Sequence, residues 1–365
     1  MNPIRVLQVV TIMNRGGLET MLMNYYRKID RNKIQFDFMV HREEEGHYDK
    51  EILSLGGRIF KMPRIRPGNY RKYFKKLDGF FESNKGYRIV HSHINENSSF
   101  VLRAAKRAGI PGRIAHSHLS DLGIDAKLPF RLYARYLMKD VPTKYFACSE
   151  KAGQWLFGKS SNEITVLNNA VNVNDFNFNP EVRKKVREEL GVGNKLVVGH
   201  IGRFNKQKNH EFLIDIFKCL HQKRPDAVLV LAGDGDLKPS IEKKVKSLGL
   251  TKNVLFIGVR SDIADLLQGM DLFLFPSLFE GLPVVLVEAQ AAGLKCIVSD
   301  AITQESDVTG RVEFVSLNNT PESWANKIIS STYEHANTAD MLSQLGYDTA
   351  TMAEWLSKFY LLEAK

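Results

Sequence analysis

Cysteine is scarce in this chain of 365 residues, and its placement does not suggest cross-links. The three cysteines, Cys148, Cys219 and Cys296, lie far apart and form no Cys-x-x-Cys pair. This pattern argues against a disulfide scaffold and a structural zinc site, and it favours a reducing compartment. With 12 prolines, 26 glycines and 44% hydrophobic residues, the chain is neither low-complexity nor disordered.

Long apolar stretches are also absent: no run approaches the ~18 residues that a membrane-spanning helix requires. The apolar residues 6–13 follow Arg5, as the core of a signal peptide would. They form only a very short segment, however, which includes Gln8 and leads into Asn14-Arg15-Gly16-Gly17 rather than a cleavage site. We therefore interpret this segment as a first buried strand and expect a cytoplasmic protein.

Positive charge is unevenly distributed. The whole chain has 51 Lys and Arg against 41 Asp and Glu, whereas residues 1–175 hold 29 and 17 and the remainder 22 and 24. A basic first half favours an anionic partner, namely nucleic acid, an anionic membrane surface or a phosphorylated substrate. No helix-turn-helix, RNP, KH or zinc pattern accompanies the charge, so we expect no nucleic-acid partner.

The densest basic patch spans residues 61–76, where cations alternate with Tyr70, Tyr73 and Phe74. Its cations are Lys61, Arg64, Arg66, Arg71, Lys72, Lys75 and Lys76. Two interpretations are open. The rings enter an anionic leaflet while the cations pair with headgroups, or the patch is a solvated helix whose aromatic residues belong to the core. The first would place the protein peripherally on the inner face of the cell membrane.

Apolar, β-branched runs alternate with amphipathic stretches, which predicts parallel sheets covered by helices. The expected strands are 4–12, 35–40, 58–61, 89–93, 113–116, 144–148, 164–167, 196–201, 227–232, 254–257, 272–275 and 295–298. The expected helices are 17–28, 98–108, 128–138, 180–190, 209–221, 237–248, 263–268, 283–292 and 349–362. The chain thus predicts an α/β fold of two Rossmann-like domains, 1–175 and 176–345, with a linker near 170–195 and a terminal helix in 346–365.

In open parallel sheets, ligands bind beyond the carboxyl ends of the strands, so residues at those ends carry most weight. Gly16 and Gly17 follow the first strand and open a helix, where the backbone can approach a phosphate, although a plain tight turn has the same pattern. Two other strands end in paired histidines: His91, His93, His116 and His118. Because carboxylates at metal-ligand spacing are missing, we expect no metal, and favour hydrogen bonding to a polar substrate or structural packing.

Cations and glycines follow two strands of the second half. Gly202 and Arg203 come directly after strand 196–201, with Lys208 close behind. Arg203 and Lys208 would form a two-pronged anion clamp, as a departing diphosphate requires. Gly233, in Gly233-Asp234-Gly235, predicts either a second turn whose backbone comes close to a ligand or an ordinary tight turn.

The most specific motif follows strand 272–275. Gly281 frees the backbone, Pro283 suits a first helical turn, and the amides from Leu282 to Val284 predict a phosphate cradle at a helix N-terminus. Glu280 precedes this cradle and Glu288 follows two helical turns later. Both carboxylates can therefore accept hydrogen bonds from sugar hydroxyls of one ligand.

This segment resembles the retaining glycosyltransferases of the GT-B fold, specifically family 4 with its Glu-x7-Glu signature. The resemblance rests on Phe279-Glu280-Gly281-Leu282-Pro283 through Glu288-Ala289, Gly293 and Ser299-Asp300, and on Gly16-Gly17 with Glu19, Gly202-Arg203, Lys208 and Gly233-Asp234-Gly235. Asn209 and Lys295 depart from the pattern, standing where Gly and Pro are common. The stretch Ala115-His116-Ser117-His118 and the Trp324 segment are similar to bacterial exopolysaccharide and capsule enzymes.

The resemblance implies an N-terminal acceptor domain and a C-terminal nucleotide-sugar domain facing a cleft, with the terminal helix crossing back to the first. Arg203 and Lys208 would neutralise the donor diphosphate, and amides near Leu282 and Pro283 would hold its phosphates. Glu288 would bond the ribose and Glu280 the sugar. The Gly16-Gly17 loop would lie under the diphosphate from the opposite side, and the N-terminal histidine corresponds to either His116 or His118.

The leading hypothesis is a retaining, metal-independent glycosyltransferase without a cofactor. It would move a hexose or N-acetylhexosamine from a UDP-sugar, with a GDP-sugar as second choice, to a glycan or lipid-diphosphate-linked acceptor in cell-surface polysaccharide biosynthesis. A GT-B sugar-nucleotide epimerase, a phosphorylase, a nucleic-acid-binding protein and a non-catalytic sugar-nucleotide-binding module are the alternatives. No segment suggests the pyridoxal phosphate lysine that a phosphorylase requires.

Overall fold

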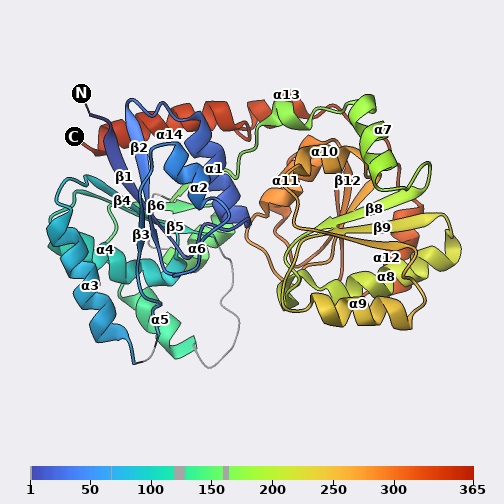
Figure 1. The fold of residues 1–365 in the computed structure, drawn as a ribbon, viewed down its shortest axis with the longest axis horizontal. Helices are drawn as coiled ribbons and strands as arrows, with labels where there is room; N and C mark the ends of the chain where they lie inside the picture. Colours follow the sequence, from blue (N-terminus) through green and yellow to red (C-terminus); the bar gives the residue numbers. More distant parts are fainter. Residues whose placement is uncertain (1, 67, 119–127, 159–163) are drawn as a thin grey trace. The chain divides into compact units, whose positions relative to one another are not determined.

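The computed structural model describes residues 2–66, 68–118, 128–158 and 164–365, and the chain divides into two compact units (Figure 1). The first unit comprises Met1–Ala170 and Thr349–Lys365, and the second comprises Val171–Asp348. The boundaries predicted at 175 and 345 are therefore wrong by a few residues. The reason is a pairing of the two crossing segments, in which Val171 N–H donates to the Tyr347 carbonyl at 2.9 Å.

The first unit is built on a parallel sheet of seven strands in the order β3-β2-β1-β4-β5-β6-β7. Its strands are β1 (Ile4–Val10), β2 (Ile34–Val40), β3 (Ile59–Lys61), β4 (Ile89–Ser92), β5 (Gly112–Ser117), β6 (Lys144–Ala147) and β7 (Ile164–Val166). Its helices are α1 (Gly17–Lys28), α2 (Asp49–Ser54), α3 (Tyr70–Ser83), α4 (Ser98–Arg107), α5 (Leu128–Tyr136), α6 (Glu150–Phe157) and α14 (Thr349–Glu363).

Strand alternation gives this sheet two buried faces. Leu7 and Val9 of β1 belong to the apolar core formed with α3, α4 and α5. On the other face, Phe36 of β2 stacks on Tyr26 of α1 and meets the ring of Tyr360 of α14 edge-on. The terminal helix thus packs against the first unit, beside α1 (Figure 1).

The aromatic residues of the basic patch do not lie where the membrane interpretation placed them. Tyr73 is fully buried in the core, and its hydroxyl lies 2.9 Å from His41 Nε2. Tyr70 and Phe74 are half-buried. The leaflet interpretation is therefore wrong for Tyr73, because that side of α3 covers the sheet.

The second unit contains a parallel sheet of six strands in the order β10-β9-β8-β11-β12-β13. Its strands are β8 (Leu196–Ile201), β9 (Ala227–Ala232), β10 (Val254–Gly258), β11 (Leu272–Phe275), β12 (Lys295–Ser299) and β13 (Val312–Val315). Its helices are α7 (Pro180–Glu189), α8 (His210–Lys223), α9 (Lys238–Ser247), α10 (Ile263–Gln268), α11 (Val284–Ala291), α12 (Pro321–Ile329) and α13 (Ala339–Gln344). The predicted α/β fold with two Rossmann-like sheets is confirmed.

The helix predicted at 180–190, within the linker region 170–195, is confirmed as α7, and from Val171 on this segment belongs to the second unit. Asn179 caps α7 by accepting from the backbone amides of Glu181 and Val182. Arg183 and Arg187 of this helix both pair with Asp271, which precedes β11. These ion pairs fasten α7 to the edge of the sheet where β11 begins.

Both sheets reverse their strand order once, between β1 and β4 and between β8 and β11. Ligands of open α/β sheets bind at the carboxyl ends of the strands that flank such a reversal. The loops after these four strands hold most of the predicted site residues. Among the described residues, no helix is both long and apolar enough to cross a bilayer.

Candidate active site

Two loops of the second unit meet where its strand order reverses. Residues 202–209 follow β8, and residues 276–283 follow β11. The Leu278 N–H donates to the Gln207 carbonyl at 2.8 Å, and the Gln207 side-chain amide donates to the Phe279 carbonyl at 3.0 Å. The two loops therefore form one continuous rim at the carboxyl edge of the sheet.

The Glu280 carboxylate on this rim is buried and paired. Lys208 Nζ lies 2.6 Å from Glu280 Oε1 and 4.5 Å from the centre of the Phe275 ring. The Gln207 amide donates to Glu280 Oε2 at 3.1 Å. Arg203 is exposed and has no partner in the part of the chain that the structure describes. Of the two predicted clamp residues, Arg203 is therefore free to meet an anion, whereas Lys208 is engaged with Glu280.

Backbone geometry explains two residues of the rim. Gly233 has a φ of +141°, and a Cβ there would collide with the Gly202 carbonyl, so the turns after β8 and β9 can pack closely only with glycine. Asn209, the departure from the family pattern, has a φ of 55° and a ψ of 44°. This is the left-handed region that glycine favours and that asparagine tolerates better than most residues.

The helix α11 begins at Val284, one residue later than predicted, with Pro283 as its N-cap. Its first backbone bond runs from Leu286 N–H to the Pro283 carbonyl at 3.0 Å. The amides of Val284 and Val285 have no acceptor among the described residues, as expected for a first helical turn. Pro283 has no N–H and cannot donate, so the donors at the start of α11 include the amides of Val284 and Val285.

Glu288 lies on α11 and is 9% exposed. Burial raises the pKa of its carboxyl from 4.5 to about 7, and no hydrogen-bond partner for this carboxyl is found among the described residues. A buried carboxyl without a partner is costly for a fold. The arrangement is therefore typical of a carboxyl that hydrogen-bonds to a hydroxyl of a bound ligand.

In the first unit, Gly16 and Gly17 lie at the start of α1, after β1. Gly16 is the N-cap, and a Cβ at this position would collide with the Glu19 carboxylate, which folds back over it. Gly16 thus makes room for a side chain of its own helix. The amides that follow it occupy a helix N-terminus, where an anion is favoured.

The four histidines come together at the carboxyl ends of β4 and β5. His91 stacks on His93 and His116 on His118, with ring centres 4.2 and 4.0 Å apart. Two edge-to-edge contacts join the stacks, His91 Nε2 to His116 Nδ1 at 3.1 Å and His93 Nδ1 to His118 Nε2 at 3.0 Å. We call these four residues the histidine array.

Gln8 of β1 and Tyr360 of α14 determine which ring nitrogens of the array donate and which accept. The Gln8 carbonyl accepts from His93 Nε2 at 2.9 Å, and the Gln8 amide donates to the Tyr360 hydroxyl at 3.2 Å. The Tyr360 hydroxyl lies 2.6 Å from His91 Nδ1, and because it accepts from Gln8 we assign it as the donor in this pair. All four rings consequently carry their proton on Nε2, and one chain of hydrogen bonds runs from His118 to His116.

The two ends of this chain differ. His118 is half-buried, and its Nδ1 lone pair lies at the open end of the chain. His116 is fully buried, and its Nε2 has no partner among the described residues. Burial lowers the pKa of His118 to about 3 and those of the other three histidines well below 6.5, so the array is neutral. Of the two candidate histidines, His118 is therefore the one with an exposed part.

Three histidines of the array also lie close enough together to be considered as metal ligands. One nitrogen each from His91, His93 and His116 lie within 4.8 Å of one another. Yet the rings of His91 and His116 are nearly parallel, at 17°, and the nitrogens between them already share a hydrogen bond. Ligands of one ion direct their lone pairs to a common point, which stacked rings do not.

Sequence reasoning missed three residues of these sites. Gln207 orients Glu280, and Gln8 and Tyr360 connect the histidines. Gln8 is the one polar residue among the buried residues 6–10 of β1, which is a usable signal. Nothing in the sequence points to Tyr360, since its partner His91 lies 269 residues away.

Comparison with known proteins identifies the family. The sequence model described as "Glycosyl transferases group 1" matches residues 182–347. A "Putative glycosyltransferase EpsF" from Bacillus subtilis is 39% identical over 94% of this chain and 93% of that protein. A "UDP-Gal:alpha-D-GlcNAc-diphosphoundecaprenol alpha-1,3-galactosyltransferase" from Escherichia coli is 28% identical over 73% and 72%.

Solved structures show the same fold. The crystal structure of Anabaena Alr3699/HepE in complex with UDP-glucose has a TM-score of 0.80, covers 98% of this chain and 99% of that one, and is 20% identical. This likeness supports the predicted GT-B fold, and the sequence relationship supports the enzyme class. The chain belongs to the group 1 glycosyl transferases, and the protein is a glycosyltransferase.

Proposed function

We propose that this glycosyltransferase is retaining and metal-independent, and that it transfers a hexose or N-acetylhexosamine from a UDP-sugar to a lipid-diphosphate-linked or glycan acceptor. The observation that supports it most is the rim of the second unit. Free Arg203, the buried Lys208–Glu280 pair and the first turn of α11 meet at one sheet edge. This combination of donors and carboxylates fits a diphosphate joined to a sugar.

Each group has a role in this proposal. Arg203 and the amides of Val284 and Val285 bind the diphosphate and stabilise its charge as it leaves. Glu288 accepts from the ribose and Glu280 from the transferred sugar. Lys208 holds Glu280 in place and compensates its charge, which a buried carboxylate requires.

The transfer needs no side-chain nucleophile. The bond between the anomeric carbon and the diphosphate oxygen breaks, and the acceptor oxygen bonds to the same face of that carbon. The proton of the acceptor hydroxyl passes to the departing phosphate oxygen. The configuration of the anomeric carbon is therefore retained, and His118 of the first unit assists by accepting a hydrogen bond from a substrate hydroxyl.

The donor and acceptor classes are supported by the related proteins. The Escherichia coli relative is named for UDP-Gal and a diphosphoundecaprenol acceptor, and the Anabaena structure holds UDP-glucose. We assign the donor to the second unit and the acceptor to the first. A role in cell-surface polysaccharide assembly and a peripheral place on the inner membrane face follow from the family resemblance and the basic first half.

Nucleotide release tests this proposal. UDP-Glc, UDP-Gal, UDP-GlcNAc and GDP-Man are incubated with the protein and a glycolipid extract in EDTA. We expect release from one UDP-sugar, a product with the donor's anomeric configuration by NMR, and a roughly 10²–10³-fold lower kcat in Glu280→Gln. The control Glu322→Gln breaks an exposed ion pair with Lys223 and should change nothing. Normal turnover in Glu280→Gln, or inversion, contradicts the proposal.

A further inference from the structure

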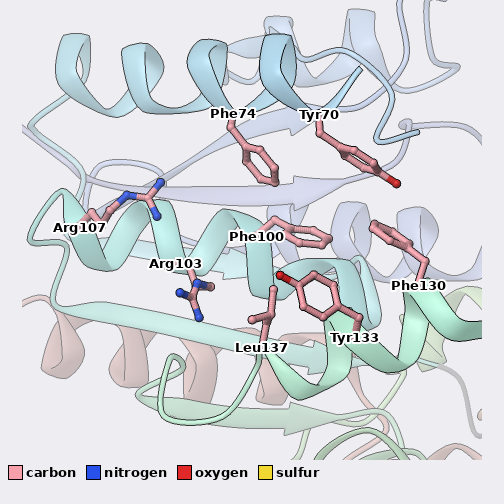
Figure 2. Close-up of a pocket in the computed structure, with 8 residues that line it drawn as sticks. All are labelled: Tyr70, Phe74, Phe100, Arg103, Arg107, Phe130, Tyr133 and Leu137. Atoms are coloured by element: carbon pink, nitrogen blue, oxygen red, sulfur yellow. The ribbon is translucent and has the colours of Figure 1, made fainter. Parts of the chain in front are cut away.

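A pocket of about 510 Å³ lies between α3, α4 and α5 of the first unit (Figure 2). This volume is within the range of small-molecule sites. The pocket opens on the side of the sheet that carries Leu7 and Val9, whereas the histidine array lies with Gln8 on the other side. It is therefore separate from the groups that we assign to transfer.

Four aromatic rings form one wall of the pocket. Phe130 stacks on Tyr70 and on Phe100, with ring centres 5.4 and 5.6 Å apart. Phe74 closes the circuit, 5.6 Å from Phe100 and 6.5 Å from Tyr70. Figure 2 shows these rings facing the space between the helices. Such a wall presents a continuous apolar surface whose rings are fixed by one another.

The helix α5, which carries Phe130 of this wall, and the residue after it also supply the rest of the lining and an apolar outer surface. Tyr133 and Leu137 line the pocket, and Tyr133 is 55% exposed. Its neighbours Leu132 and Tyr136 are 50% and 68% exposed. Exposed apolar residues beside an apolar pocket mark a surface that meets another apolar phase.

Of the two cations that line the pocket, one has no partner among the described residues. Arg107 is paired with Asp78 at 2.6 Å, whereas Arg103 is exposed and has no partner within the described ranges. Outside the pocket, α3 exposes Arg71, Lys72, Lys75 and Lys76 along its solvent side. An apolar pocket with a free guanidinium, next to a basic helix face, complements a molecule with a hydrocarbon chain and a phosphate.

We propose that this pocket binds one acyl chain of an anionic membrane phospholipid, with the lipid phosphate at Arg103. The chain lies against the aromatic wall and under Tyr133. The exposed residues of α5 enter the leaflet interface, and the basic face of α3 meets neighbouring headgroups. The pocket thereby adds a chain-binding contact to an attraction that charge alone would leave reversible and salt-sensitive.

Titration with a short-chain lipid in monomeric form tests the pocket directly. We expect dioctanoyl phosphatidylglycerol to bind about fivefold more tightly than dioctanoyl phosphatidylcholine, and glycerol phosphate not to bind. Arg103→Gln should abolish the difference between the two lipids, and Tyr133→Ser should weaken both about tenfold. Both side chains are exposed, so the fold should tolerate these changes. Lys50→Gln, an exposed charge on α2, is the matched control and should behave as wild type.

Flotation with vesicles separates the pocket from the basic face. Changing Arg71, Lys72, Lys75 and Lys76 together to Gln should abolish flotation with phosphatidylglycerol vesicles at low salt but leave binding of the monomeric lipid intact. Failure of the monomeric lipid to bind, equal binding by Tyr133→Ser, or binding of glycerol phosphate alone would overturn the proposal. None of these outcomes depends on the donor specificity or on sugar transfer.

Discussion

At the scale of single residues, the site of the second unit holds a carboxyl whose environment opposes its charge. Glu288 is buried, and its pKa is raised to about 7. Between pH 4.5 and 7 the unfolded chain releases this proton while the folded protein keeps it. The unfolded state therefore binds fewer protons, and the free energy of unfolding falls as pH rises through this window.

Glu288→Gln should remove that pH dependence. We expect melting temperatures close to wild type at pH 5, and a variant more stable than wild type at pH 8, by on the order of 3 kcal/mol. The same variant should bind UDP more weakly, because the carboxylate is its proposed partner for the ribose. Exposed Glu322→Gln serves as control. Parallel melting curves for wild type and Glu288→Gln from pH 5 to 8 would show that burial of Glu288 has no such cost.

The sequence predicts that Arg203 and Lys208 both bind the diphosphate, but the surroundings of the two side chains differ. Lys208 lies over Phe275 and against Glu280, so removing it leaves a buried carboxylate uncompensated. Arg203 has no such structural duty. Effects of Arg203 variants therefore report on ligand binding, whereas those of Lys208 combine binding with stability.

At the scale of elements, the terminal helix α14 completes the first unit chemically as well as by packing. Its Tyr360 hydroxyl joins Gln8 to His91, and without it the histidine array is cut in two. The array fixes the proton of His118 on Nε2 and leaves Nδ1 as the acceptor. In the function that we propose, Tyr360 is thus a positioning residue for His118.

Tyr360→Phe should reduce both stability and turnover. Two buried polar groups lose their partner, which costs about 1–3 kcal/mol of unfolding free energy. Tyr73→Phe is the matched control, because it breaks the buried bond to His41 at 2.9 Å on the opposite side of the sheet. Both variants should melt earlier, but only Tyr360→Phe should lower kcat at temperatures where both are folded. Equal kcat in the two variants would mean that the array is merely structural.

The sequence predicts correctly those elements in which the local pattern of apolar residues is enough to show which positions are buried. The strands β8, β9 and β11 and the helices α1 and α10 begin and end where their apolar patterns place them. The edge strand β13 was missed, since only its first and last residues are buried. The period of two placed each histidine pair on one face. Their partner Tyr360 depends on how a distant helix docks, which local pattern does not encode.

At the scale of the whole molecule, the two units differ in charge. The first holds 31 Lys and Arg against 18 Asp and Glu, and the second holds 20 against 23. The acidic excess of the second unit would repel a nucleotide diphosphate at long range, so binding there depends on local groups. The basic first unit suits an anionic surface and a phosphorylated acceptor.

In the function that we propose, the second unit binds a nucleotide diphosphate through Arg203 and helix amides without a metal. Calorimetric titration with UDP in EDTA tests it most directly, using wild type, Arg203→Ala and the exposed neighbour Lys206→Ala as control. We expect wild type and Lys206→Ala to bind alike in EDTA, and Arg203→Ala to bind at least about tenfold more weakly. Binding that requires Mg²⁺ or Mn²⁺, or that is unchanged in Arg203→Ala, would contradict the claim.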